Sequence, residues 1–276
     1  MKIYTLMENT VVSPELKCSH GLSFYIETEH HKILFDMGQN DDFLHNAEVL
    51  GIDISEVDIA YLSHGHYDHG GGIDGFLRAN KKAEIHIQKS ALGSYWAQDP
   101  GEKRYIGLSD AWRDNERIII HEGDYVIDSE LQVFAGVIER DCYSPANDRL
   151  LEQYADSFEK DLFVHEQNLL IHEKGKNVLF AGCAHNGIVN IMKKAAEITG
   201  DKLEAVFGGM HLKGAFEKEE ELEAFCKVLS EKLLNYDTSY HTCHCTGTDA
   251  FEKLQDYMKG RIKYSAAGSI YNIDDL

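Results

Sequence analysis

Prolines and long apolar runs are scarce in this chain. Only 3 prolines occur among its 276 residues, and no stretch rich in serine and glycine separates one part from another. Nothing marks a domain boundary, so we expect a single domain over residues 1–276. No run of about 18 apolar residues is present, so no membrane span is expected. The N-terminal residues Met1–Leu6 lead straight into polar Glu8. The apolar core of a signal peptide is therefore missing, which favours a cytoplasmic location.

The 6 cysteines are few for the length and scattered along the chain. Their low density favours reduced thiols over the disulfide framework of a small secreted protein.

Basic side chains are also scarce. The chain has 27 Lys and Arg against 47 Asp and Glu, which gives a formal net charge of −20. This charge repels a phosphate backbone, so nucleic acid is not expected as a partner. A small anionic substrate remains compatible, because bound divalent cations reverse the sign of the field inside a pocket.

Short apolar runs alternate with amphipathic stretches, which is typical of a mixed α/β chain. Strands are expected at Lys2–Met7, Leu22–Glu27, Lys32–Phe35, Val57–Leu62, Glu84–Gln88, Leu131–Val137, Asn168–His172, Asn177–Ala181, Glu204–Phe207 and Lys263–Ser265. The clearest helix is expected at Glu217–Asn235, where the apolar residues fall on one face.

Two parts of the chain echo each other. Leu22–Asp36 and Leu169–Ala181 both read as strand, charged turn and strand, followed by a glycine-containing loop and a helix. A further apolar strand then ends in small residues and a histidine, His64 in the first part and His211 in the second. We therefore expect two similar halves, packed sheet against sheet with the helices outside.

Two insertions, at about 91–117 and 139–165, hold aromatic residues among many charges and show weak periodicity. Long insertions of this kind often form lids or substrate walls. Surface elaboration or a contact in a homodimer is the equally weighted alternative.

Four potential metal ligands, His64, His66, Asp68 and His69, lie within six residues after the apolar strand Val57–Leu62. Such a cluster in a loop at the end of a buried strand suits metal coordination far better than packing. The glycines at 70–72 are expected to turn the backbone tightly and to lead into a helix near Ile73. The N-terminal amides of that helix would face the cluster and favour an anion beside it.

The pattern His-X-His-X-Asp-His formed by these four residues resembles the signature of the metallo-β-lactamase superfamily. The resemblance implies an α/β (α+β) fold, a four-layer αββα sandwich, with a two-metal site. By position, His64, His66 and His185 would hold one metal, and Asp68, His69 and His244 the second. Other stretches resemble the group typified by the archaeal dihydropterin–ribofuranosylaminobenzene phosphate synthase, namely 8–10, 20–23, 35–39, 182–185 and 208–212.

The chain departs from the superfamily after the strand that ends at Phe207. Many members place there an aspartate that bridges the two metals, whereas residues 208–212 contain no carboxylate. Without this aspartate, three alternatives are open. The second metal is held weakly, His211 takes a ligand or acid/base role, or a substrate oxygen completes the site. We favour His211 beside the substrate as a catalytic, proton-transferring group.

In Cys243-His244-Cys245, neighbours on an extended strand point to opposite sides. We expect His244 to face the metals and both thiols, like Cys183, to serve packing.

Three further polar residues are candidates for the site. Asp36 ends a strand and is expected to orient a ligating histidine, with turn capping as the alternative. Asn9 and His20 follow early strands and are expected to line the substrate pocket, with ordinary loop roles as the alternative.

These residues predict a metal-dependent hydrolase or metal-assisted transferase acting on a small phosphorylated or pyrophosphorylated substrate, pterin-like if the group resemblance extends to it. Asp68 and His211 are the expected catalytic groups. The expected cofactors are two divalent ions, zinc first and iron or manganese as alternatives, because imidazole-rich sites accept all three. A lactone or thioester hydrolase and a di-iron redox or sensing protein are the rival functions. A structural zinc site is disfavoured, because such sites are closed four-ligand cages.

Overall fold

The computed structural model describes residues 1–200 and 202–275, and two seven-stranded sheets form its centre. The first sheet, in spatial order, consists of β18 (Ile270–Asn272), β1 (Lys2–Met7), β2 (Ser23–Glu27), β3 (Lys32–Phe35), β4 (Ile59–Tyr61), β5 (Glu84–Gln88) and β8 (Ile118–His121). The second consists of β17 (Ile262–Tyr264), β16 (Ser239–Thr242), β15 (Ala205–Gly208), β14 (Lys176–Phe180), β13 (Gln167–Glu173), β10 (Leu131–Ala135) and β9 (Tyr125–Val126).

The two sheets have the same topology. From β18 to β3 in the first sheet, and from β9 to β14 in the second, every strand pair is antiparallel. From β3 to β8, and from β14 to β17, every pair is parallel. The expectation of two similar halves is therefore confirmed at the level of strand pairing.

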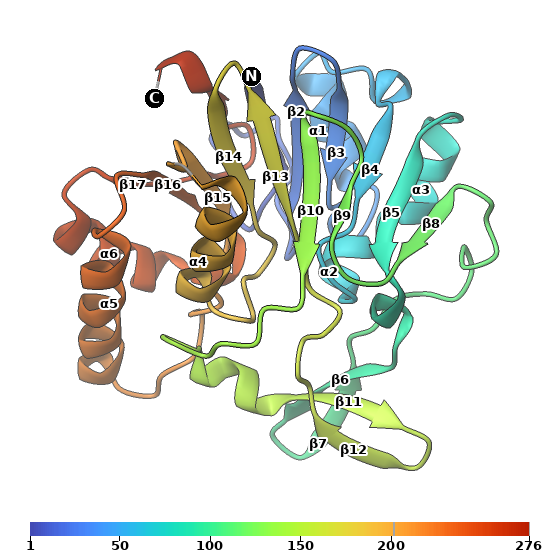
Figure 1. Ribbon diagram of the computed structural model, residues 1–276. Helices are drawn as coiled ribbons and strands as arrows, with labels where there is room; N and C mark the ends of the chain where they lie inside the picture. Colours follow the sequence, from blue (N-terminus) through green and yellow to red (C-terminus); the bar gives the residue numbers. More distant parts are fainter. Residues whose placement is uncertain (201, 276) are drawn as a thin grey trace.

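Helices cover the outer face of each sheet. They are α1 (Asp42–Val49), α3 (Ile73–Ala79), α4 (Ile188–Thr199), α5 (Glu219–Leu233) and α6 (Thr248–Met258), whereas α2 (Tyr67–Gly70) is a single turn that follows β4. Figure 1 shows α4, α5 and α6 on the outside of the second sheet, where Met192, Leu229 and Leu254 join one buried core. On the first sheet, Phe43 of α1 and Phe76 of α3 belong to a separate core.

The core between the sheets is rich in phenylalanine. Phe24 and Phe35 from the first sheet meet Phe180 from the second, with ring centroids 5.9 Å and 6.0 Å apart. The order of layers is thus helix, sheet, sheet, helix, as the family resemblance implied. All the strands expected from apolar runs are present, with ends shifted by at most two residues.

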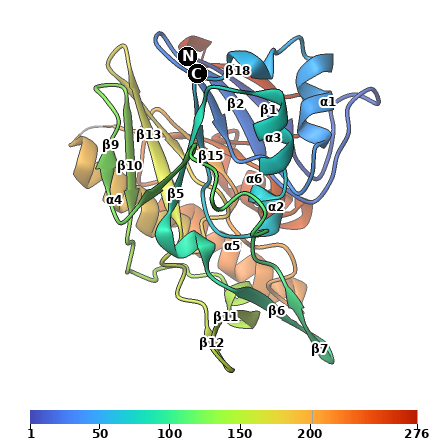
Figure 2. The same ribbon diagram turned by 90° about the vertical axis from the view of Figure 1, so that its right-hand side faces the viewer.

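The two insertions form a third sheet that sequence periodicity did not predict. Its order is β12 (Ser157–Lys160), β11 (Leu150–Tyr154), β6 (Tyr95–Asp99) and β7 (Glu102–Tyr105). The insertions pair with each other, because β6 and β11 are its central strands. Figures 1 and 2 show this sheet beyond one end of the main sheets, opposite the chain termini. None of the helices in the described part of the chain has the length and apolarity needed to cross a membrane.

Candidate metal centre

The candidate residues gather where parallel strands end. His64 follows β4, Cys183 and His185 follow β14, His211 follows β15, and His244 follows β16. Carboxyl ends of neighbouring parallel strands lie at one edge of a sheet, and ligands of α/β proteins bind beyond that edge. Packing of the two sheets face to face brings both edges together, on the side that faces the third sheet.

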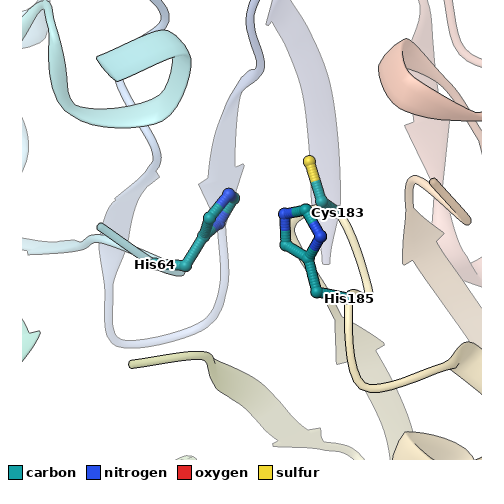
Figure 3. Close-up of side chains that lie close together, drawn as sticks. All are labelled: His64, Cys183 and His185. Atoms are coloured by element: carbon teal, nitrogen blue, oxygen red, sulfur yellow. The ribbon is translucent and has the colours of Figure 1, made fainter. Parts of the chain in front are cut away.

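The expected imidazoles converge at this edge. The ring of His64 lies 4.6 Å from that of His66, 4.1 Å from that of His69 and 4.9 Å from that of His185. The ring of His244 lies 5.0 Å from that of His69. Figure 3 shows His64 on one side, and Cys183 and His185 on the loop opposite, across a narrow gap.

Side chains able to hold a metal form overlapping triads, each with its ligand atoms within 4.8 Å of one another. One contains His64 and His185, another His69 and His244, and Cys183 is the third member of both. Asp68 groups with His244 and His20, and His66 groups with Asp161 and His165. The two expected ligand sets are therefore neighbours, although His66 and Asp68 also face partners that the sequence did not suggest.

Burial keeps several of these imidazoles neutral. Desolvation is the largest influence on His64 and His185, and it lowers the pKa of each well below the usual range. Their Nε2 atoms, with that of His66, are buried and lack a hydrogen-bond partner among the described residues. Neutral imidazoles with free nitrogens are the form that binds a divalent cation. The residues present therefore fit a metal.

His69 differs from these histidines because two carboxylates flank it. Burial lowers its pKa, but the charges of Asp36 and Asp68 outweigh burial and raise it to about 9. His69 is thus protonated at neutral pH in the metal-free chain. A metal that binds its Nε2 atom must displace that proton.

Asp36 connects two of the candidate ligands. Its Oδ2 accepts hydrogen bonds from His69 Nδ1 at 2.6 Å and from Ser63 Oγ at 2.7 Å. The same Ser63 hydroxyl lies 2.8 Å from His64 Nδ1. Asp36 is fully buried, and its Oδ1 also accepts a hydrogen bond from the amide of Ser63 at 2.7 Å. The carboxylate thereby fixes the orientation of His69 directly and that of His64 through Ser63.

His185 is held by two residues of the second insertion and by Glu166, which directly follows that insertion. Its Nδ1 lies 2.9 Å from Asn147 Oδ1, and its ring stacks on Phe163 with centroids 4.4 Å apart. Glu166 accepts hydrogen bonds from the amides of His185 and Asn186 at 2.6 Å and 3.0 Å. Sequence reasoning missed these three supports, because no motif links them to a histidine that lies 19 to 38 residues further on.

Asn9, expected to line the substrate pocket, is not among the residues that line the cavity, and it contacts His244 instead. Its Oδ1 is 3.0 Å from His244 Nδ1, and its amide donates to the His244 carbonyl at 3.2 Å. His20 does line the cavity, with its Nε2 3.1 Å from Asp68 Oδ2. His211 also lines the cavity, its ring 4.2 Å from that of His185. Neither ring nitrogen of His211 has a hydrogen-bond partner in the described part of the chain.

The expected alternation in Cys243-His244-Cys245 is wrong. Strand β16 ends at Thr242, and His244 has a φ of 51° at the start of a 3-10 turn, so side chains no longer point to opposite sides. His244 and Cys245 both line the cavity, and so does Cys183. Only Cys243 packs into the core between the sheets. All 6 cysteines are free thiols.

The loop expected around the metal cluster is partly helical. Asp68 and His69 lie in the single turn α2, and Gly71 has an ordinary right-handed φ of −64°. The glycines serve close packing instead of a tight turn. A β-carbon on Gly71 would lie 2.3 Å from Gln39 O, and one on Gly72 would lie 2.2 Å from Met37 O.

A cavity of about 400 Å³ opens over the histidines. The first insertion contributes Arg104 to its wall, and the second contributes Arg149 and Leu150. Lys213, two residues after His211, lies in the same wall. Both insertions therefore form walls of the cavity, one of the two roles expected for them.

Known proteins resemble this chain in sequence and in fold. The family model of the metallo-β-lactamase superfamily matches residues 16–141. The chain is 29% identical to the 7,8-dihydropterin-6-methyl-4-(β-D-ribofuranosyl)-aminobenzene-5′-phosphate synthase of Methanocaldococcus jannaschii, over 98% of this chain and 96% of the relative. A metal-dependent hydrolase of the β-lactamase superfamily is similar in structure, with a TM-score of 0.79, 28% identity, and coverage of 99% of this chain and 98% of that one. The short form of human tRNase Z shares the fold, with a TM-score of 0.54, 13% identity and 99% coverage of both chains.

Proposed function

Because the chain belongs to the metallo-β-lactamase superfamily, we propose that it is an enzyme that uses two divalent metal ions to cleave or transfer a small phosphorylated or pyrophosphorylated substrate. In this proposal one ion is held by His64, His66 and His185. The other is held by Asp68, His69 and His244. Zinc is the first expectation, with iron and manganese as alternatives.

The metals would supply Lewis acidity, which polarises a phosphoryl oxygen and makes water a nucleophile at neutral pH. The protein's own side chains would do the rest. Asp68 lies at the cavity floor with one carboxylate oxygen within 3.2 Å of His20 Nε2 and His244 Nε2. That position suits it to orient a nucleophile. His211 faces the same cavity with both ring nitrogens free of hydrogen bonds to the described residues, so it can donate or accept a proton.

The observation that carries the proposal is the charge of the cavity wall. In a chain with a net charge of −20, three basic side chains line this one cavity. Arg104 is paired with Asp99, whose Oδ2 lies 2.8 Å from Arg104 Nε. Within the described part of the chain, neither Arg149 nor Lys213 makes a side-chain hydrogen bond or ion pair. Two unpaired cations beside a histidine cluster favour a substrate with a negatively charged phosphate.

The name of the archaeal relative supports the same class of substrate. That protein is named for a product that carries a 5′-phosphate and a dihydropterin. The present chain covers 96% of its length, so the comparison is with the whole relative. We therefore propose that the substrate of this chain is also phosphorylated. A substrate with a pterin-like group is the first candidate to test.

The experiment compares Arg149→Ala with the wild-type protein on a panel of phosphoesters, pyrophosphates and lactones. Loss of a charge-assisted hydrogen bond costs about 1.5–3 kcal/mol, so KM for a phosphorylated substrate should rise by roughly 10- to 100-fold. Metal content should stay unchanged, because Arg149 is not among the candidate ligands. Lys227→Ala, a basic residue on α5 away from the cavity, is the matched control and should leave KM unchanged.

Two results would overturn the proposal. Turnover of lactones or thioesters without phosphoesterase activity would assign the cavity to the rival hydrolase. An iron-specific absorption spectrum without hydrolysis of any substrate in the panel would assign it to a di-iron redox protein.

A further inference from the structure

The loop that follows β15 offers no carboxylate to the two candidate ligand sets. Residues 208–212 contain no Asp or Glu, and a side chain at position 209 would not fit in this arrangement. A β-carbon on Gly209 would lie 2.3 Å from Cys245 Sγ and 3.3 Å from Gly182 O. No carboxylate of this loop can therefore join the two ligand sets, which turns attention to the side chains at the other strand ends.

Cys183 is placed where such a group is needed. Its sulfur belongs to the triad with His64 and His185 and also to the triad with His69 and His244. The sulfur lies 3.2 Å from His69 Nε2, and the side chain is only 2% exposed. Figure 3 shows it beside His185, on the loop that faces His64. The buried Nε2 atoms of His64 and His185 lack partners among the described residues, so they are free to share a metal with this sulfur.

We propose that Cys183 bridges the two metal ions through its thiolate, in place of the missing carboxylate. This inference rests on the two-metal centre of the proposed function. The thiol gives up its proton to solvent as the metals bind, because only the thiolate is a metal ligand. With the thiolate of Cys183 beside the carboxylate of Asp68, the centre has two anionic ligands. Their negative charges offset part of the positive charge of two divalent ions.

A bridging thiolate narrows the choice of metal. Soft thiolate ligands favour zinc or iron, whereas manganese and magnesium prefer carboxylate, carbonyl and water. Cys183 therefore favours zinc or iron over manganese in this site.

The other two buried cysteines nearby do not fit the bridging position. Cys245 groups with Cys183 and His211, but with neither His64 nor His69. Cys243 packs into the core between the sheets. Both are therefore matched controls for substitution at Cys183.

The test is X-ray absorption spectroscopy of the zinc-loaded protein, with zinc content measured on the same sample. The wild-type protein should hold two zinc ions and show a zinc–sulfur distance of about 2.3 Å. A bridging sulfur gives one sulfur neighbour per zinc on average, whereas a sulfur bound to one ion gives half that number. Cys183→Ser should lose the sulfur signal and bind the second zinc at least roughly 10-fold more weakly.

The double variant Cys243→Ser/Cys245→Ser should keep the sulfur signal. This variant assigns the sulfur by elimination even if Cys183→Ser fails to fold. Two bound zinc ions without a sulfur neighbour, half a sulfur per zinc, or a signal that survives in folded Cys183→Ser would overturn the bridging thiolate while leaving the proposed function intact. A protein that binds one zinc ion or none would contradict the two-metal centre itself.

Discussion

At the scale of single residues, three of the candidate ligands each have a side-chain partner that fixes the ring. His69 donates to the carboxylate of Asp36, whereas His185 and His244 meet the side-chain amides of Asn147 and Asn9. A carboxylate partner makes an imidazole a stronger electron donor than an amide does. Asp36 should therefore matter most for the metal that His69 is proposed to bind.

We predict that Asp36→Asn lowers the affinity for that metal by about 10- to 100-fold, the usual effect of losing such a partner. The measurement is competition with a chelator of known affinity, with unfolding curves to show that the fold is retained. Asp74→Asn, at an exposed position of α3, is the control and should bind metal as the wild type does. Equal affinities in the two variants would show that Asp36 only caps its turn.

At the scale of elements, the third sheet supports the cavity wall. Trp96 on β6 contacts Tyr105 of β7 and Phe158 of β12, with ring centroids 5.3 Å and 5.5 Å apart. Arg104 and Arg149 are carried by β7 and by the segment that enters β11. The aromatic cluster thus sets where these guanidinium groups lie over the histidines.

Trp96→Ala should loosen the third sheet without unfolding the main sheets. We expect a local cost of about 1–3 kcal/mol, less than the ~3–5 kcal/mol of a fully buried site, because Trp96 is only partly buried. Hydrogen exchange should accelerate in β6, β7, β11 and β12, and KM for a phosphorylated substrate should rise with metal content unchanged. Val228→Ala, exposed on α5, is the control. Unchanged exchange in these four strands would contradict the supporting role of Trp96.

At the scale of the whole molecule, one histidine ties the two sheets together. His31 in the β2–β3 turn lies 3.1 Å from Asp58, and 2.7 Å from Asp128 in the β9–β10 turn of the other sheet. Glu130 also faces it, at 4.0 Å. Burial lowers the pKa of His31, but the hydrogen bonds that His31 donates to Asp128 and Asp58 outweigh burial and raise it. A raised pKa in the folded protein means that protonated His31 stabilises the fold.

This stabilisation is fully present below the unfolded pKa of about 6.5, and it is lost as the pH rises through the folded pKa. His31→Gln should therefore lower the free energy of unfolding by about 0.5–1 kcal/mol near pH 6, a modest value because the site is partly solvated. The difference from the wild type should shrink in alkaline solution. Urea unfolding across this pH range measures it, and exposed His30→Gln is the control. If the difference in the free energy of unfolding between the wild type and His31→Gln grew with pH, the pKa of His31 would not be raised in the folded protein.

Local sequence determined those parts of this protein that depend on neighbouring residues. The apolar runs predicted their strands, and the faint repeat between Leu22–Asp36 and Leu169–Ala181 predicted two similar halves, which are two sheets with the same pattern of strand pairing. The cluster around His64 identified the site, because four ligating side chains in six residues are a local pattern. His185 and His244 were predicted as ligands because the resemblance to the metallo-β-lactamase superfamily implies one further ligand after each later strand.

Only the tertiary structure decided which distant side chains share a volume. The third sheet needs two insertions to pair, and the support of His185 by Asn147 and Phe163 depends on where the second insertion runs. The position of Cys183 between two histidine pairs likewise depends on both sheet edges meeting. Such contacts join residues far apart in sequence, and their geometry is fixed by the packing of whole layers. For that reason the cluster of candidate ligands around His64 could be predicted from the sequence, whereas the cavity wall and the position of the Cys183 thiol could not.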